Sequence, residues 1–203
     1  RCALFYNTVG DFNQAMGDKA LFNNVAGNCN TAIGRCSLVS TTSGCHNVGI
    51  GCGSLFNSNS GCSNVAVGAD SLCSNYGGDY NTAVGRYAMG SNKTGDQNVA
   101  IGYYSLWANT AHGNTAMGYA AAQRTTSGYY NTALGICTLN DNETGNNNVA
   151  VGHCALHENE ASGNTGVGMY ASLCNTSGTR NVAVGCGALC AGTDGDGNTA
   201  VGY

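Results

Sequence analysis

Cysteine is the residue type that offers this chain the most chemistry. Its 203 residues include 12 cysteines, and thiols form disulfides, bind soft metal ions or act as nucleophiles. So many cysteines favour an oxidising compartment, because cytosolic thiols are kept reduced. The sequence therefore predicts an extracellular or cell-surface protein in which some of these cysteines are bonded.

The other residues with chemical potential show no catalytic or metal-binding arrangement. His153, Cys154 and His157 carry suitable ligand atoms for zinc, but no second ligand pair follows at the spacing of a zinc finger. The acidic residues are scattered, and there is no phosphate-binding loop or nucleophile motif. We therefore expect a protein that is not an enzyme and that holds no metal or other cofactor.

A repeat fills the chain and positions all of these residues. Its core pattern is Asn, then Thr or Val, Ala, an apolar residue and Gly, as in Asn98–Gly102, and we call the last residue the marker glycine. The marker glycines follow one another at intervals of 17 residues or, twice, of 16, and they are Gly17, Gly34, Gly51, Gly68, Gly85, Gly102, Gly118, Gly135, Gly152, Gly168, Gly185 and Gly202. A fixed period is typical of solenoid proteins, in which each copy is stabilised by its neighbours.

A period of 17 residues is too short for a pair of helices and suits one coil of a parallel β-solenoid. It predicts two strands of about five residues per coil, joined by tight turns. We expect the β-branched and apolar residues of the pattern to face inward, where leucines four residues after the marker glycine meet them. Residues 1–203 are thus predicted to form a single all-β solenoid of twelve coils, without a separate domain.

Asparagine stands four residues before every marker glycine and forms the most regular polar column of the repeat. In stacked parallel strands, asparagine side chains hydrogen-bond along the stack. The sequence therefore predicts an asparagine ladder made of Asn13, Asn30, Asn47, Asn64, Asn81, Asn98, Asn114, Asn131, Asn148, Asn164, Asn181 and Asn198.

Stacked coils bring equivalent residues about 4.8 Å apart, within reach of a disulfide. Cys45 and Cys62 share one position in neighbouring coils, Cys137 and Cys154 share another, and Cys174 and Cys190 both follow a leucine (Leu173, Leu189). We predict these three pairs as disulfides. The register assigns no partner to the remaining cysteines, which bridge diagonally, pair with another chain or stay free: Cys2, Cys29, Cys36, Cys52, Cys73 and Cys186.

Three sequons for N-linked glycosylation occur, at Asn92, Asn142 and Asn175. All three asparagines lie ten residues before a marker glycine, in one column of the repeat. We expect this column to form an exposed turn, which would make the three asparagines candidates for glycosylation.

Composition narrows the range of partners. Charged residues make up only 9% of the chain, the net charge is −4, and there is no basic stripe of the kind that binds nucleic acid. No apolar run is long enough to cross a membrane, so we expect neither nucleic-acid binding nor membrane insertion. Tyrosines one or two residues after the marker glycines form a candidate strip for contact with surface glycans or another partner.

The repeated Asn-Thr/Val-Ala-Ile/Val-Gly-x-x-Ala-Leu unit resembles the head repeats of trimeric autotransporter adhesins (YadA-like). It is more similar still to the "NTAIG" repeats of bacterial surface and phage tail-fibre-like proteins. The resemblance covers the whole chain and implies a left-handed parallel β-roll, often trimeric, displayed as a stalk or fibre. The chain departs from these repeats in its cysteine content and its 17-residue period.

These observations predict a non-enzymatic extracellular structural protein, a β-solenoid segment of a fibre, filament or adhesive stalk. Arg1 and Tyr203 share one phase of the repeat, which suggests a piece of a longer array or one unit of a head-to-tail rod. The expected partners are other copies, end to end or as a trimer, and surface glycans.

Two alternatives stay open. One is a receptor-binding phage tail-fibre shaft. The other is an ice-binding solenoid, in which a flat threonine column orders water, and it fails if that column is buried. Valines interrupt the column, whose threonines are Thr31, Thr82, Thr115, Thr132, Thr165 and Thr199.

Overall fold

The computed structural model describes residues 2–191 and 194–203, which form strands, turns and loops and no helix. The chain divides into two compact units, Arg1–Ile101 and Gly102–Tyr203, each described by itself. The strands of the first unit are β1 (Gln14–Met16), β2 (Thr31–Ile33), β3 (Val48–Ile50), β4 (Val65–Val67), β5 (Thr82–Val84) and β6 (Val99–Ile101). Those of the second are β7 (Thr115–Met117), β8 (Thr132–Leu134), β9 (Val149–Val151), β10 (Thr165–Val167), β11 (Val182–Val184) and β12 (Thr199–Val201).

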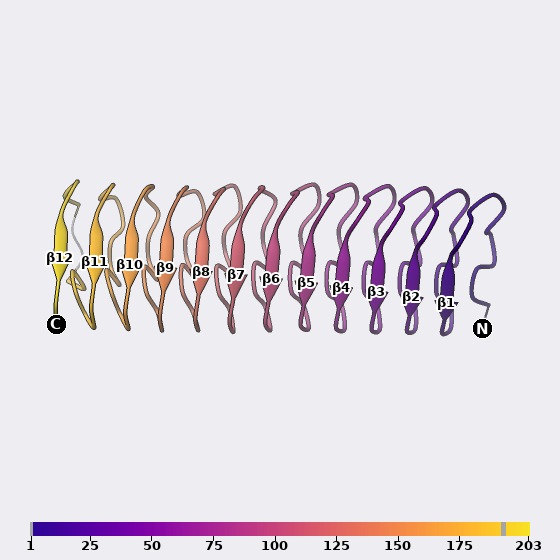
Figure 1. Cartoon of the computed structure of the whole chain (residues 1–203), viewed down its shortest axis with the longest axis horizontal. Helices are drawn as coiled ribbons and strands as arrows, with labels where there is room; N and C mark the ends of the chain where they lie inside the picture. The colour runs from indigo at the N-terminus through magenta and orange to yellow at the C-terminus, as the bar shows by residue number, and fades with distance from the viewer. Residues whose placement is uncertain (1, 192–193) are drawn as a thin grey trace. The chain divides into compact units, whose positions relative to one another are not determined.

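Within each unit, every strand pairs in parallel with the strand of the next coil (Figure 1). Ala15 of β1 lies opposite Ala32 of β2, a shift of 17 residues, whereas Ala150 of β9 lies opposite Gly166 of β10, a shift of 16. The short coil therefore keeps the sheet in register and loses its residue from a turn, where Ala161 takes the place of a glycine. The predicted parallel β-solenoid is confirmed.

The interior of each coil is narrow and is filled by small residues. The central alanines of the inner strands, such as Ala32, are fully buried, and so are the leucines four residues after the marker glycine from Leu21 to Leu156, such as Leu38. At Gly49, which replaces this alanine in β3, an added Cβ would lie 2.6 Å from Ser37 Oγ and 3.2 Å from Leu38 Cδ1.

The prediction that β-branched and apolar residues face inward is therefore wrong. The residues that flank the central alanine are only half-buried, as Thr31 and Ile33 are in β2. Side chains such as those of Ser37 and Leu38 fill the interior and leave room for little more than a methyl group at the inward strand position, so the flanking residues lie on the outer face of the sheet.

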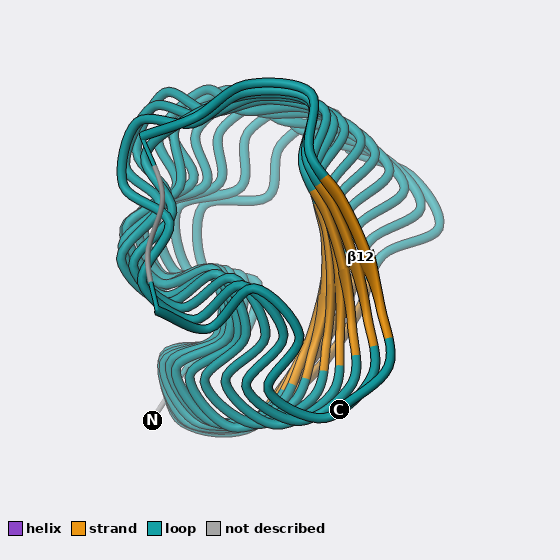
Figure 2. Ribbon diagram, turned by 90° about the vertical axis from the view of Figure 1, so that its left-hand side faces the viewer, coloured by secondary structure: helices purple, strands orange, loops and turns teal. Residues whose placement is uncertain are grey.

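Each described coil contains one strand, and the prediction of two strands per coil is also wrong. After the marker glycine the chain forms turns instead, which close the coil opposite the strands (Figure 2). The buried leucines there have left-handed backbone, with φ of 52° at Leu38 and 48° at Leu72. This conformation costs a non-glycine residue about 1–2 kcal/mol. Coil-to-coil hydrogen bonds offset it, as Leu38 N donates to Ser54 O at 2.9 Å.

Two columns of glycine are required for different reasons. The marker glycines adopt φ values between 126° at Gly152 and 143° at Gly118, which side chains rarely permit. The glycines seven residues before the marker allow close approach of coils, because a Cβ added at Gly61 would lie 2.5 Å from Gly78 O.

Candidate functional site

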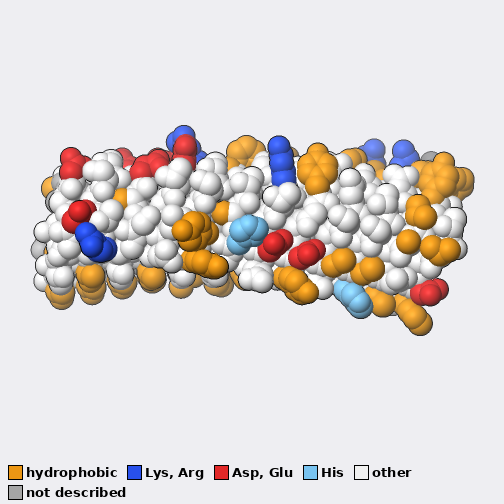
Figure 3. Space-filling model, turned by 90° about the horizontal axis from the view of Figure 1, so that it is seen from above, with side chains coloured by type: hydrophobic (Ala, Val, Ile, Leu, Met, Phe, Trp, Pro, Cys, Tyr) orange, Lys and Arg blue, Asp and Glu red, His pale blue; other side chains and the backbone are white. Residues whose placement is uncertain are grey.

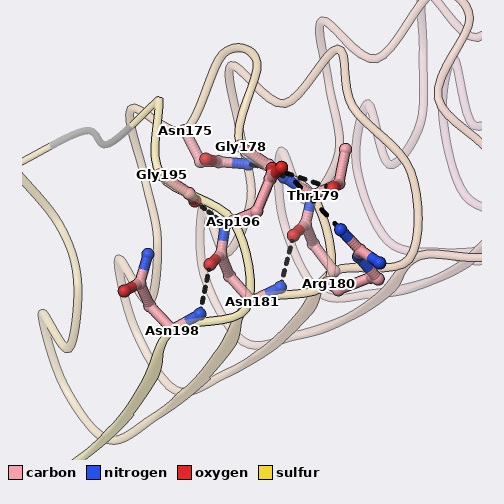
Figure 4. Close-up of polar contacts among 9 residues, drawn as sticks. Asn175, Gly178, Thr179, Arg180, Asn181, Gly195, Asp196 and Asn198 are labelled. Carbon is pink, nitrogen blue, oxygen red and sulfur yellow. Dashed lines mark hydrogen bonds and ion pairs between the residues drawn. The ribbon is translucent and has the colours of Figure 1, made fainter.

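The ladder asparagines join each coil to the next through their side chains. Asn64 Oδ1 accepts the N–H of Asn81 at 2.9 Å, and Asn64 Nδ2 donates to Gly78 O at 2.8 Å. In the second unit, the N–H of Asn198 donates to Asn181 Oδ1 at 2.8 Å, and Asn181 Nδ2 donates to a glycine carbonyl at 2.9 Å (Figure 4). One buried side chain thus binds two backbone groups of the following coil.

The same pair of contacts recurs within both units. It is made by Asn13, Asn30, Asn47, Asn64 and Asn81 in the first unit, and by Asn114, Asn131, Asn148, Asn164 and Asn181 in the second. Asn98 donates its N–H to Asn81, and the N–H of Asn198 ends the second series. Because buried backbone groups must be paired, these amides are consumed in holding the stack together.

A second polar column, ten residues before the marker glycine, also lies inside the coil. It contains the three sequon asparagines, and Asn92, Asn142 and Asn175 are all fully buried. Each Nδ2 donates to the carbonyl three residues further on, at 3.0, 2.9 and 2.8 Å respectively. The expectation that the sequons form an exposed turn is wrong, and the folded coil offers no Nδ2 for a sugar.

A third column was missed by the sequence analysis. It lies six residues before the marker glycine, where a side chain accepts a hydrogen bond from a backbone N–H of the preceding coil. Asp79 Oδ1, for example, accepts from Cys62 N at 2.7 Å. Cys62 Sγ takes the N–H of Cys45 in the same way, at 3.2 Å. In the second unit, Asp196 accepts from Thr179 N at 2.7 Å (Figure 4), which lowers the pKa of Asp196. The recurrence of Asn, Asp, Ser and Cys at this position was the available signal.

All twelve cysteines are free thiols, so the structure does not support the predicted disulfides. The register nevertheless places Cys137 beside Cys154, whose pKa is raised by burial and by the neighbouring Cys137 thiol. Disulfide formation at Cys137–Cys154, at Cys45–Cys62 and at Cys174–Cys190 stays a prediction.

The register predicted for the third pair is wrong. Ser172 is buried, with φ of 51°, and occupies the leucine position that Leu189 holds in the next coil, with φ of 55°. Leu173 therefore lies one residue beyond that position, and Cys174 lies one residue further along its coil than Cys190. The pKa of Cys174 is raised, first by burial and then by the Glu158 carboxylate and the Cys190 thiol.

The outer face of the sheet presents two columns of residues, three and one before the marker glycine, which we call the sheet face. Ile50 is 38%, Met117 43% and Val184 37% exposed, and no residue in either column is charged. Figure 3 shows regularly spaced hydrophobic side chains along the lower edge of its left half, where the second unit lies. The threonine column, which includes the half-buried Thr132, belongs to this face and is not buried.

A second outer feature, the aromatic cluster, lies in the first coils of the second unit and consists of Tyr103, Tyr104, Trp107 and Tyr119. The rings of Tyr103 and Tyr119 stack with centroids 5.8 Å apart, and Tyr104 meets Trp107 edge-on at 6.0 Å. Tyr119 is 55% exposed. The predicted tyrosine strip is therefore present in this part of the chain as a group of contacting rings.

Charged side chains of the second unit gather in neighbouring coils. Arg124 bonds Asp141 at 3.3 Å and Glu143 at 3.0 Å. The pKa of Glu160 is raised by burial first and by the Glu143 carboxylate second. His157 Nδ1 lies 3.8 Å from Asp141.

The described residues contain no group of three His, Cys, Asp or Glu side chains placed to hold a metal ion. His153 Nε2 lies 3.5 Å from Cys154 Sγ, which is a contact of two groups only. No described helix is long and apolar enough to cross a membrane.

Comparison with known proteins adds no relative. No protein-family model matches the chain, and no curated protein or solved structure matches it. The repeat β-solenoid is shown by the structure, whereas the resemblance to YadA-like head repeats and to NTAIG repeats stays a prediction.

Proposed function

We propose that this chain is a non-enzymatic structural protein, a segment of an extracellular fibre, filament or adhesive stalk. The observation that carries the proposal is the asparagine ladder. In each unit, the ladder asparagines bond one coil to the next, as Asn64 bonds both Asn81 and Gly78. Side chains held in this way stiffen a stack and are not available for catalysis.

Self-association is part of the proposal, either end to end or as a trimer. It is supported by the sheet face, which is uncharged over the coils of each unit and presents exposed apolar side chains such as Ile50 and Met117. Exposed apolar surfaces of this kind mark interaction sites. The extracellular location rests on the cysteine content.

Cryo-electron microscopy of the native chain, without reductant and over a range of concentrations, tests this function. Filaments longer than one chain, with coils about 4.8 Å apart, support a filament, and bundles of three support a stalk. Single chains at every concentration, with no end-to-end or lateral association, overturn the structural role.

A second candidate, an ice-binding solenoid, is favoured by one observation: the threonine column lies on the outer sheet face, with Thr132 only half-buried. Thr115 and Thr132 pair in neighbouring strands, so their methyl and hydroxyl groups would lie about 4.8 Å apart on this face, although Val149 and Val182 interrupt the column further along. Nanolitre osmometry tests this candidate. Freezing-point depression that disappears in Thr132→Lys supports it, and no depression by the unaltered protein excludes it.

A further inference from the structure

The aromatic cluster forms an exposed surface that the structural role does not use. Tyr119 is 55% and Trp107 38% exposed, although aromatic side chains are normally buried for most of their area. Their rings are held by the other two tyrosines, since Tyr119 stacks on Tyr103 with planes 20° apart and Tyr104 supports Trp107. Pre-arranged, contiguous aromatic surface of this kind marks a binding site.

Two amide side chains, those of Gln123 and Asn140, belong to the coils that follow Trp107. The N–H of Ala108 donates to Gln123 O at 3.0 Å, which places Gln123 next to Trp107 in the following coil. Asn140 Nδ2 donates to Ala120 O at 2.9 Å and to Gln123 Oε1 at 3.4 Å. Within the described part of the chain, Gln123 Nε2 and Asn140 Oδ1 have no hydrogen-bond partner, so one donor and one acceptor are available to a ligand.

The charge around this surface favours a neutral ligand. Neither the four rings nor the two amides carry a charge, and Arg124, which follows Gln123 in the chain, is bonded to Asp141 at 3.3 Å and Glu143 at 3.0 Å. Two carboxylates face this one guanidinium, so the group carries a net negative charge and does not attract an anion. An anionic ligand would therefore find no free cation on this surface.

We propose that the aromatic cluster, together with Gln123 and Asn140, binds a neutral oligosaccharide. The apolar C–H face of a pyranose ring matches the exposed faces of Tyr119 and Trp107, and its hydroxyl groups match the amide donor and acceptor. This site would give the proposed adhesive stalk a ligand, but its chemistry does not depend on assembly. A chain that fails to associate can still bind the sugar, and a chain that assembles can fail to bind it.

Trp107 is the only tryptophan of the chain, so its fluorescence reports on this site alone. The probes are three neutral linear hexasaccharides, of β-1,4-linked glucose, β-1,4-linked N-acetylglucosamine and α-1,4-linked glucose. We expect a saturable change of Trp107 emission with at least one of them. The proposal is overturned if no probe gives a saturable change at concentrations up to about 10 mM, which exceeds the Kd of a weak millimolar complex.

Three variants separate stacking from folding. Tyr119→Ala is expected to weaken binding about tenfold or more, whereas Tyr119→Phe keeps the ring and the affinity. Tyr129→Ala is the matched control, because Tyr129 is 42% exposed and contacts Tyr130 rather than the cluster. Wild-type affinity in Tyr119→Ala, with an unchanged circular dichroism spectrum, refutes the site.

Discussion

Removal of one ladder side chain from the middle of a unit is the sharpest perturbation that the structure offers. In Asn64→Ala, the N–H of Asn81 loses its partner at 2.9 Å, whereas Gly78 O loses one of two donors and keeps Asn75 Nδ2 at 2.8 Å. Asn64 is fully buried, so water does not replace the lost side chain. One orphaned buried group costs about 1–3 kcal/mol, and we expect Asn64→Ala to lower the free energy of unfolding by about this amount.

Urea denaturation followed by circular dichroism measures this loss, with Asn59→Ala as the control. Asn59 has an exposed side chain in the same unit, and its replacement should change stability by less than about 0.5 kcal/mol. If Asn64→Ala and Asn59→Ala unfold at the same urea concentration, the ladder does not stabilise the stack and the reasoning is refuted.

Asn64→Asp adds a pH test of the same contacts. The substitution keeps an acceptor for the N–H of Asn81, but an ionised carboxylate cannot donate to Gly78 O and is costly to bury. A protonated carboxyl can donate. We therefore expect Asn64→Asp to be strongly destabilised at pH 7 and partly restored as the pH falls, whereas Asn64→Ala should show no such recovery.

Three further predictions concern the second unit. Ser172→Leu should stabilise the chain by about 1–3 kcal/mol in calorimetry, because Ser172 fills a leucine position and its buried hydroxyl has no partner; a lower midpoint contradicts this. Burial and then Glu143 raise the pKa of Glu160 above its ordinary value of 4.5, so its ionised form destabilises the fold at neutral pH. Glu160→Gln should therefore resist urea better than the wild type at pH 7, with an advantage that shrinks as the pH falls through the raised pKa and is absent below 4.5. Oxidised glutathione should join Cys137 to Cys154, releasing two reduced glutathiones; peptide mass spectrometry that finds only mixed disulfides would refute this pairing.

The stacking register was predictable from the sequence because every coil repeats the same polar position. Asn30 and Asn47 are 17 residues apart, and equal spacing places them over one another in a parallel stack. The missing residue of a short coil did not disturb this prediction, since Ala161 supplies the carbonyl that a glycine supplies elsewhere, accepting from Asn148 at 2.8 Å.

Strand rules could not predict that each described coil has only one strand. They also could not predict which face of that strand lies inside the coil. Leucine is rarely left-handed, yet Leu38 and Leu139 have φ of 52° and 47°, because coil-to-coil hydrogen bonds and full burial outweigh the local preference. The inward position of Ala32 depends on how much space the opposite turn leaves, which is a property of the closed coil. Period-two alternation indicates two faces without saying which one is inside.

The sequons show a similar limit. A motif such as Asn92-Lys93-Thr94 is defined by residue type alone, whereas the repeat makes its asparagine a buried donor to Gly95 O at 3.0 Å. The Asn-x-x-Gly spacing shared by this column was the signal for an internal hydrogen bond.

The central claim is that asparagine side chains hold each coil to the next, in addition to the backbone hydrogen bonds of the strands and turns. Native-state hydrogen exchange resolved to single amides tests it most directly. We predict that the N–H groups of Asn47, Asn64 and Asn81, each bonded to the preceding ladder side chain, exchange as slowly as those within the strands. Exchange of these amides at the rate of the exposed turns, with protection confined to the strands, would contradict the claim.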